Sequence, residues 1–291
     1  MSIEKYNRFK QKQREHQLRE LPALYILICL LLRIDPLPEK IEIKDYGIGT
    51  EKVEEELKSL IKDAKIIRMD VDTTRAKDSH EKIYNAFKAG EADILIGTQM
   101  VSKGLDFPNV TLVGILSADM SLNLPDYRAA ERSFQIITQV AGRAGRGEKE
   151  GEVIVQTYTP EHYSLQYAKK YDYEDFYEKE FTIRAMMGYP PFGRILLING
   201  IGKNEDELKK QMIFLGKKVK EKAEEFGGLE VLGPTPCIIY KIKENYRWQI
   251  IVKGEFSSKF SKSIKDLLYD KANNVYNDIR VSMDINPNSL S

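Results

Sequence analysis

Short apolar segments alternate with amphipathic helical segments between residues 41 and 160, and this alternation constrains the fold more than any other feature. Two of the apolar segments, DILIGT at 93–98 and TLVGIL at 111–116, are typical of strands buried on both faces. Strands are expected at 40–47, 65–70, 93–98, 111–116 and 152–158, and helices at 50–61, 79–90 and 127–145. Because strands that alternate with helices form a parallel sheet covered on both sides, we predict one α/β domain over residues 41–160.

The order of the expected elements changes after residue 192. Strand, helix, strand, strand, helix and strand follow one another, which is the βαββαβ order of ferredoxin-like folds. These elements are expected at 194–202, 205–226, 230–242, 246–254, 261–270 and 279–285. A Tyr-rich helical connector over residues 161–191 precedes them and ends at Pro190 and Pro191. The sequence therefore predicts a smaller α+β domain over residues 192–291.

The composition excludes several classes of protein. Lys and Arg number 45 against 44 for Asp and Glu, so any contact with nucleic acid must come from a local basic patch. Cys29 and Cys237 are the only cysteines, which excludes a disulfide framework and a Cys-rich zinc site. The apolar run 23–32 has about half the length of a membrane-spanning helix, and we expect a buried helix or strand there. We therefore expect a cytoplasmic protein that does not enter the membrane.

Two arginines stand between glycines in QVAGRAGRG, residues 139–147. On a continuous helix, Gln139, Arg143 and Arg146 are four and three residues apart, which places their side chains on one face. Two guanidiniums and an amide suit a triphosphate, and such an arginine stabilises charge on a γ-phosphoryl group during transfer. A helix C-terminus also favours Arg and Gly, but the repeated pattern behind Gln139 favours the catalytic interpretation.

A second polar group follows the expected strand at 93–98. Open α/β sheets bind ligands beyond the carboxyl ends of their strands. Hydroxyl, amide and lysine groups there can contact phosphates of nucleic acid, and an aspartate can hold a ribose hydroxyl or orient an arginine. An ordinary loop explains any one of these residues alone, but the group shares a domain with the arginines. Its members are Gly97, Thr98, Gln99, Lys103, Gly104 and Asp106.

Several segments, in this order, resemble a known family. GTQMVSKGLDFPNVTLV at 97–113 and PDYRAAERSFQIITQVAGRAGRG at 125–147 are similar to motifs V and VI of superfamily 2 helicases. Together with MMGYPPFGRILLI at 186–198 and LGPTPCIIYKIKENYRWQIIVKG at 232–254, they resemble the primosomal protein N′ (PriA) family of replication-restart DNA helicases. The resemblance covers residues 41–291. It implies a RecA-like, P-loop NTPase-like second helicase lobe followed by a PriA-type C-terminal domain.

The resemblance also implies roles for individual residues. Arg146 matches the arginine finger of motif VI, with Arg143 beside it and Gln139 as the leading glutamine. Motif V in such helicases couples contact with DNA to the nucleotide cleft. The implied cofactor is ATP with Mg, and the implied partners are forked or single-stranded DNA, replication-restart proteins and single-stranded DNA-binding protein. Asp126, Arg128 and Glu131 match a further family stretch, which ion pairs at a helix start explain equally well.

A basic and aromatic cluster marks the C-terminal domain. Lys241, Lys243, Arg247 and Trp248 are candidates for contact with DNA phosphates and bases. For Trp248, packing in the core is the stronger interpretation, with only the basic side chains outside.

The chain departs from the family at two points. It contains no GxxxxGK[ST] and no acidic DExH-like box, so the lobe that cradles the phosphates and holds magnesium is not expected here. The family's zinc-binding cysteine pairs are replaced by a stretch with Cys29 alone, so we expect no zinc and treat residues 1–40 as a divergent segment. We therefore expect a partial PriA-like 3′–5′ helicase that does not hydrolyse ATP alone.

Two alternatives remain open from the residues. The first is a non-enzymatic module, derived from such a helicase, that binds DNA or replication proteins through its C-terminal domain. The second, less favoured, is the second lobe of another superfamily 2 enzyme such as a RecG-like translocase, against which YPPFGR at 189–194 and RWQ at 247–249 argue.

Overall fold

The computed structural model describes residues 25–30, 49–70, 72–74, 78–98, 107, 109–145, 151–269 and 279–290, with residues 25–30 described by their backbone. Their contacts divide the chain into two compact units. The first unit comprises residues 1–33, 43–124 and 129–176, and the second comprises 34–42, 125–128 and 177–291. Among the helices in the described ranges, none is long and apolar enough to cross a membrane.

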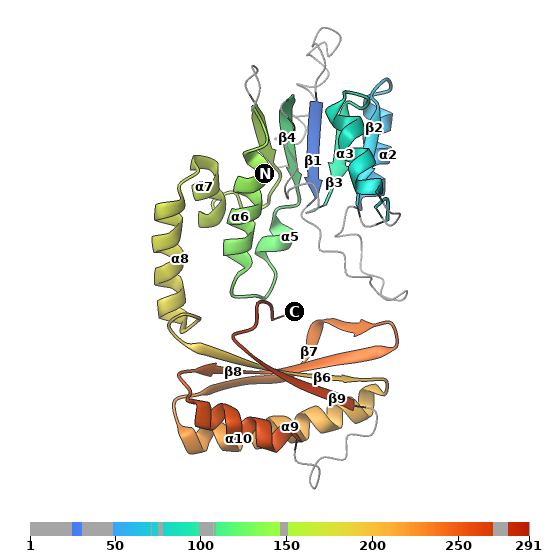
Figure 1. Ribbon diagram of the computed structural model, residues 1–291. Coiled ribbons are helices and arrows are strands. Elements are labelled where there is room, and N and C mark those ends of the chain that lie inside the picture. Colours follow the sequence, from blue (N-terminus) through green and yellow to red (C-terminus); the bar gives the residue numbers. More distant parts are fainter. Residues whose placement is uncertain are drawn as a thin grey trace. The chain divides into compact units, whose positions relative to one another are not determined.

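The first unit is built on a parallel sheet of five strands in the order β2-β3-β1-β4-β5 (Figure 1). Its strands are β1 (Tyr25–Leu30), β2 (Ile66–Met69), β3 (Ile94–Gly97), β4 (Val110–Leu116) and β5 (Glu152–Val155). β3 is buried along its whole length, as its apolar sequence predicts. The predicted α/β class is therefore confirmed.

Helices cover both faces of this sheet. They are α2 (Thr50–Leu60), α3 (Ser79–Lys88), α5 (Asp119–Leu122), α6 (Ala129–Ala141) and α7 (Tyr163–Lys170). On one face, Phe87 of α3, Phe134 of α6 and Leu165 of α7 share a core with Val113. On the other face, Val53 of α2 packs with Ile94 and Ile96. The sheet therefore has a packed apolar core on each face.

The central strand of the sheet lies in an unexpected part of the chain. β1 pairs in parallel with β3 and β4, although it falls within the segment 1–40 that the sequence analysis sets apart from the lobe. The apolar run 23–32 explains this position, because an interior strand of a parallel sheet is covered on both faces. The strand expected at 40–47 lies outside the described residues.

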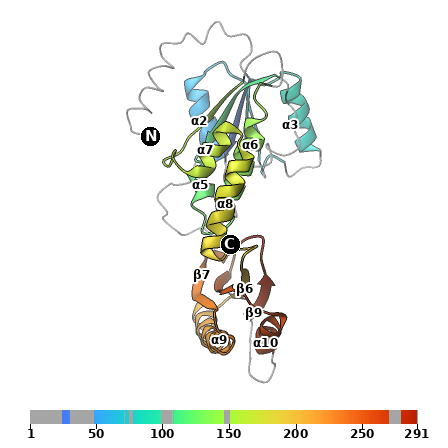
Figure 2. The same cartoon turned by 90° about the vertical axis from the view of Figure 1, so that its left-hand side faces the viewer.

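The second unit has the predicted βαββαβ order. Its elements are β6 (Arg194–Gly202), α9 (Glu205–Phe226), β7 (Glu230–Ile242), β8 (Asn245–Gly254), α10 (Ser258–Tyr269) and β9 (Ile279–Ile285). The strands form an antiparallel sheet in the order β7-β8-β6-β9, and α9 and α10 lie on the same face of it (Figure 2). Met212, Trp248 and Phe260 belong to the core between that face and the helices. The ferredoxin-like prediction is confirmed.

Candidate functional site

Polar residues line the carboxyl edge of the parallel sheet, where such sheets place their ligand sites. Asp70 follows β2, Thr98 follows β3 and Asp119 lies shortly after β4. Gly97 ends the buried strand β3, so the structure places Gly97 and Thr98 at this edge as the sequence predicts. The other motif V candidates, Gln99, Lys103, Gly104 and Asp106, lie outside the described residues.

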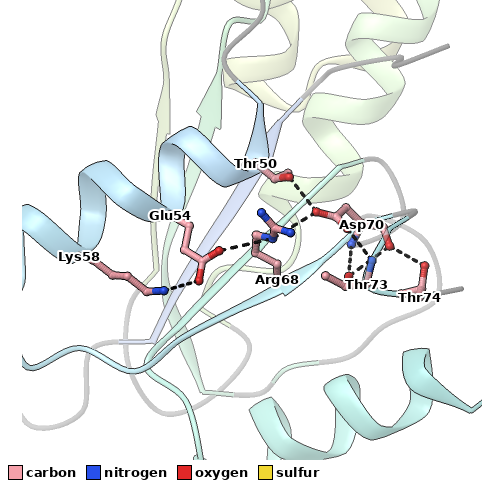
Figure 3. Close-up of polar contacts among 7 residues, drawn as sticks. All are labelled: Thr50, Glu54, Lys58, Arg68, Asp70, Thr73 and Thr74. Carbon is pink, nitrogen blue, oxygen red and sulfur yellow. Dashed lines mark hydrogen bonds and ion pairs between the residues drawn. The ribbon is translucent and has the colours of Figure 1, made fainter. Parts of the chain in front are cut away.

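Asp70 is the centre of a buried polar cluster at this edge (Figure 3). Its Oδ2 accepts a hydrogen bond of 2.7 Å from Thr50 Oγ1, and its Oδ1 accepts one of 2.9 Å from the Thr73 amide. Arg68 Nε lies 3.4 Å from the same Oδ2 and also 3.4 Å from Glu54 Oε2. The carboxylate therefore ties the first residue of α2 to the turn that follows β2.

The surroundings of Asp70 favour its ionised form. Burial opposes ionisation, but the Thr73 amide, the hydroxyls of Thr50 and Thr73 and the Arg68 guanidinium outweigh it and lower the pKa of the carboxyl. Sequence reasoning missed this cluster. Neither Thr50 nor Asp70 is among the predicted site residues, whereas the structure joins the Thr50 hydroxyl to the Asp70 carboxylate. The signal was an aspartate directly after a strand, followed three residues later by a threonine.

Asp119 makes an equivalent connection at the same edge of the sheet, near the carboxyl ends of β4 and β5. Its carboxylate accepts hydrogen bonds from the Tyr158 amide at 2.8 Å, from Thr157 Oγ1 at 2.9 Å and from Thr159 Oγ1 at 2.8 Å. Burial would raise the pKa of Asp119, but these donors lower it. Asp119 thus fixes the start of α5 to the segment after β5. Within the described residues, no group of three or more His, Cys, Asp or Glu side chains could hold a metal ion.

The structure shortens the helix expected at 127–145. α6 ends at Ala141, so Arg143 lies in a turn directly after the helix. The Arg143 amide donates to Val140 O at 3.0 Å, and the Gly145 amide donates to Val110 O at 3.0 Å. Gly145 has φ 71°, a conformation that glycine adopts without strain, which explains why the regular helix cannot continue. Gln139 is exposed near the end of α6, and Arg143 is half-buried.

Gly151 lies in close contact with Gly145 and Ala144. Arg146 itself lies outside the described residues. A Cβ at Gly151 would collide with the backbone of Gly145 and Ala144. This close backbone contact requires glycine at position 151.

The basic and aromatic candidates of the second unit do not form one surface. Trp248 is 7% exposed and belongs to the core, which confirms the packing interpretation. Arg247 precedes it on β8 and therefore points to the opposite face, where its Nη1 donates to Ile239 O at 3.4 Å. Lys241 Nζ donates to Tyr246 Oη at 2.9 Å, and the exposed Lys243 has φ 55° in the turn between β7 and β8.

Comparison with known families accounts for both units. Residues 46–148 match the helicase conserved C-terminal domain, and residues 185–288 match the primosomal protein N C-terminal domain. The chain is 46% identical over 248 residues to the replication restart protein PriA of Bacillus subtilis, across 84% of this chain and 30% of that protein. It is 42% identical over 248 residues to PriA of Synechocystis, across 85% of this chain and 29% of that protein. Most of the chain is therefore similar to one part of the replication restart protein PriA.

The PriA resemblance stated from the sequence is thus confirmed. The chain spans about 30% of the length of these PriA relatives. Among solved structures, the C-terminal domain of the DEAD-box protein Dbp5 aligns with 62% of this chain and 91% of its own, at 16% identity and a TM-score of 0.38. The strand order and the PriA match, rather than that likeness, define the fold of the first unit.

Proposed function

We propose that the chain supplies the second helicase lobe and the C-terminal domain of a PriA-type replication-restart helicase. The observation that carries the proposal is the turn after α6. This turn contains Arg143, Gly151 packs closely against its end, and the unit matches the helicase C-terminal domain. The nucleotide would be ATP with Mg, held by a first lobe in another segment or another chain.

In this proposal the arginines act on charge rather than on covalent chemistry. Arg146 stabilises the charge that develops on the γ-phosphoryl group, and Arg143 contacts the neighbouring oxygens. Gln139 orients the attacking water or the phosphate. The motif V residues Thr98, Gln99 and Lys103 contact the DNA backbone and couple its movement to the nucleotide, with 3′–5′ polarity.

The proposed partners follow from the family. The PriA relatives are named replication restart proteins, which supports forked or single-stranded DNA as the substrate. Replication-restart proteins and single-stranded DNA-binding protein are the proposed protein partners.

Reconstitution of the two lobes tests the proposal. The chain would be mixed with a fragment of Bacillus subtilis PriA that carries its first lobe, and phosphate release from ATP would be measured with and without forked DNA. We expect hydrolysis only from the mixture, and a loss of about 10³-fold with Arg146→Ala. Gln135→Ala, an exposed change on α6, is the matched control. Hydrolysis by the chain alone, insensitive to Arg146→Ala, would overturn the proposal.

A second candidate is a DNA-binding module without enzymatic activity. Arg247 favours it, because the guanidinium lies on the face of the sheet that α9 and α10 leave uncovered. Binding to forked DNA that weakens with salt, and weakens further with Arg247→Glu and Lys243→Glu, supports this candidate. Lys259→Glu, on the exposed side of α10, is the control. If forked DNA does not bind to the chain at low salt, the second candidate function is wrong.

A further inference from the structure

Four residues from the middle of the chain belong to the C-terminal unit. Residues 125–128, which we call the linking segment, cluster with the second unit, whereas α5 before them and α6 after them belong to the first. α6 begins at Ala129, directly after Arg128. The linking segment therefore leads directly into α6.

The contacts of the linking segment are made with the end of the chain. Residues 286–290, the C-terminal tail, follow β9, and Asn286 at their start has φ 49°. The Asn286 amide donates to Ile195 O at 2.7 Å, and Asn286 Oδ1 accepts from the Ile195 amide at 2.9 Å. Leu290 is 8% exposed and packs with Ile195 and Leu197. The tail is thus a fixed part of the second unit.

Each of three consecutive residues in the linking segment bonds to a different tail residue. Tyr127 Oη donates to Pro287 O at 3.1 Å, and Arg128 Nη1 donates to Asn288 Oδ1 at 2.9 Å. The Leu290 amide donates to Asp126 Oδ2 at 3.3 Å. The other carboxylate oxygen, Asp126 Oδ1, accepts from the Arg128 amide at 2.9 Å and so folds the segment into a local turn.

The ring of Tyr127 adds an apolar anchor to these bonds. It stacks on Tyr189 with centroids 5.6 Å apart and an interplanar angle of 27°, and the Arg184 guanidinium lies 5.5 Å from its centroid. It also packs against the cluster of Ile195, Leu197 and Leu290. An aromatic ring with a bonded hydroxyl is a strong and directional anchor.

We infer that the C-terminal tail is a clamp that fixes the start of α6 and, through α6, sets the position of Gln139 and Arg143. Asp126 and Tyr127 are then positioning residues that act through the helix. A rigid helix transmits a change at its first turn to its last, so release of the tail alters the arginine turn without any contact to the nucleotide. The consequence for hydrolysis rests on the proposed function, whereas the clamp itself does not.

Hydrogen exchange tests the clamp in the chain as it exists. Deletion of residues 287–291 should speed exchange of the amides of 132–136 about tenfold, because their acceptors lie in the first turn of α6 and the residue before it. Asn288→Ala, which removes one hydrogen bond and keeps the apolar contacts, should speed them about threefold. Ser282→Ala, an exposed change on β9, is the control and should leave them unchanged.

The outcomes separate the clamp from the proposed function. Faster exchange confined to the tail in both variants would show that its contacts do not reach α6 and would overturn the inference. Faster exchange in α6 supports the clamp, even if no variant hydrolyses ATP. In the reconstituted mixture, Asn288→Ala should reduce the rate of ATP hydrolysis at least twofold, with and without DNA. An unchanged rate would refute the transmission to the arginines.

Discussion

The Asp70 carboxylate connects the start of α2 to the turn after β2, and it must be ionised to accept all of its hydrogen bonds. Asp70→Asn replaces an acceptor oxygen with a donor next to Thr50 and Thr73. We expect a loss of about 1–3 kcal/mol in the free energy of unfolding of the first unit at neutral pH. Urea unfolding followed by far-UV circular dichroism measures it, and Asp63→Asn, at an exposed aspartate in the turn after α2, is the control.

The effect of Asp70 should depend on pH in one direction. The folded pKa lies below the unfolded value of about 3.9, so the contribution is present above pH ~4 and is lost as the pH falls through the folded pKa. The difference in stability between the wild type and Asp70→Asn should therefore shrink in acid. A difference that grows below pH ~4 would contradict the assigned direction.

Gly151 is the second residue with a specific steric role. A Cβ there would collide with Ala144 and Gly145, so Gly151→Ala must separate residue 151 from the turn after α6. We expect a loss of about 1–3 kcal/mol in unfolding free energy. Gly49→Ala, where an added Cβ has nothing within 4 Å, is the matched control and should cost less than about 1 kcal/mol, its helix-cap preference. An equal effect of both changes would argue against the close contact.

At the scale of elements, α9 depends on its first turn. Asn204 Oδ1 accepts a hydrogen bond of 3.2 Å from the Glu207 amide and so caps the helix. Asn204→Ala should lower the unfolding free energy of the second unit by about 1 kcal/mol, whereas Asn204→Asp should retain most of it. The fluorescence of Trp248, the only tryptophan, reports on the core that α9 covers. A full loss with the aspartate would show that the cap is not the cause.

The elements also show what the sequence could and could not predict. Period and composition were enough for the parallel sheet, for the βαββαβ order and for Gly97 and Thr98 at the sheet edge, because buried strands and amphipathic helices have local signatures. The end of α6 was not predicted, since the bond from Gly145 to Val110 O depends on a strand distant in sequence. The place of β1 beside β3 was missed for the same reason, and so was the engagement of Asp70 with Thr50.

At the scale of the whole molecule, Tyr127 should stabilise the second unit, although the helices before and after its segment, α5 and α6, belong to the first. Its ring packs with Tyr189, Ile195 and Leu197, so Tyr127→Ala should lower the unfolding free energy of the second unit by about 2–4 kcal/mol. The midpoint of the Trp248 fluorescence transition in urea measures this. Tyr158→Ala, at a residue 84% exposed in the first unit, is the control. An unchanged Trp248 transition in Tyr127→Ala would contradict the packing.

The path of the chain also affects how such a protein can change by recombination. A crossover within α8 (Tyr173–Met187) would exchange most of the second unit as one block and leave residues 125–128 behind. The C-terminal tail of one parent would then pack against Tyr127 of the other. Natural hybrids should therefore be rare unless residues 125–128 and residues 286–290 are inherited from the same parent.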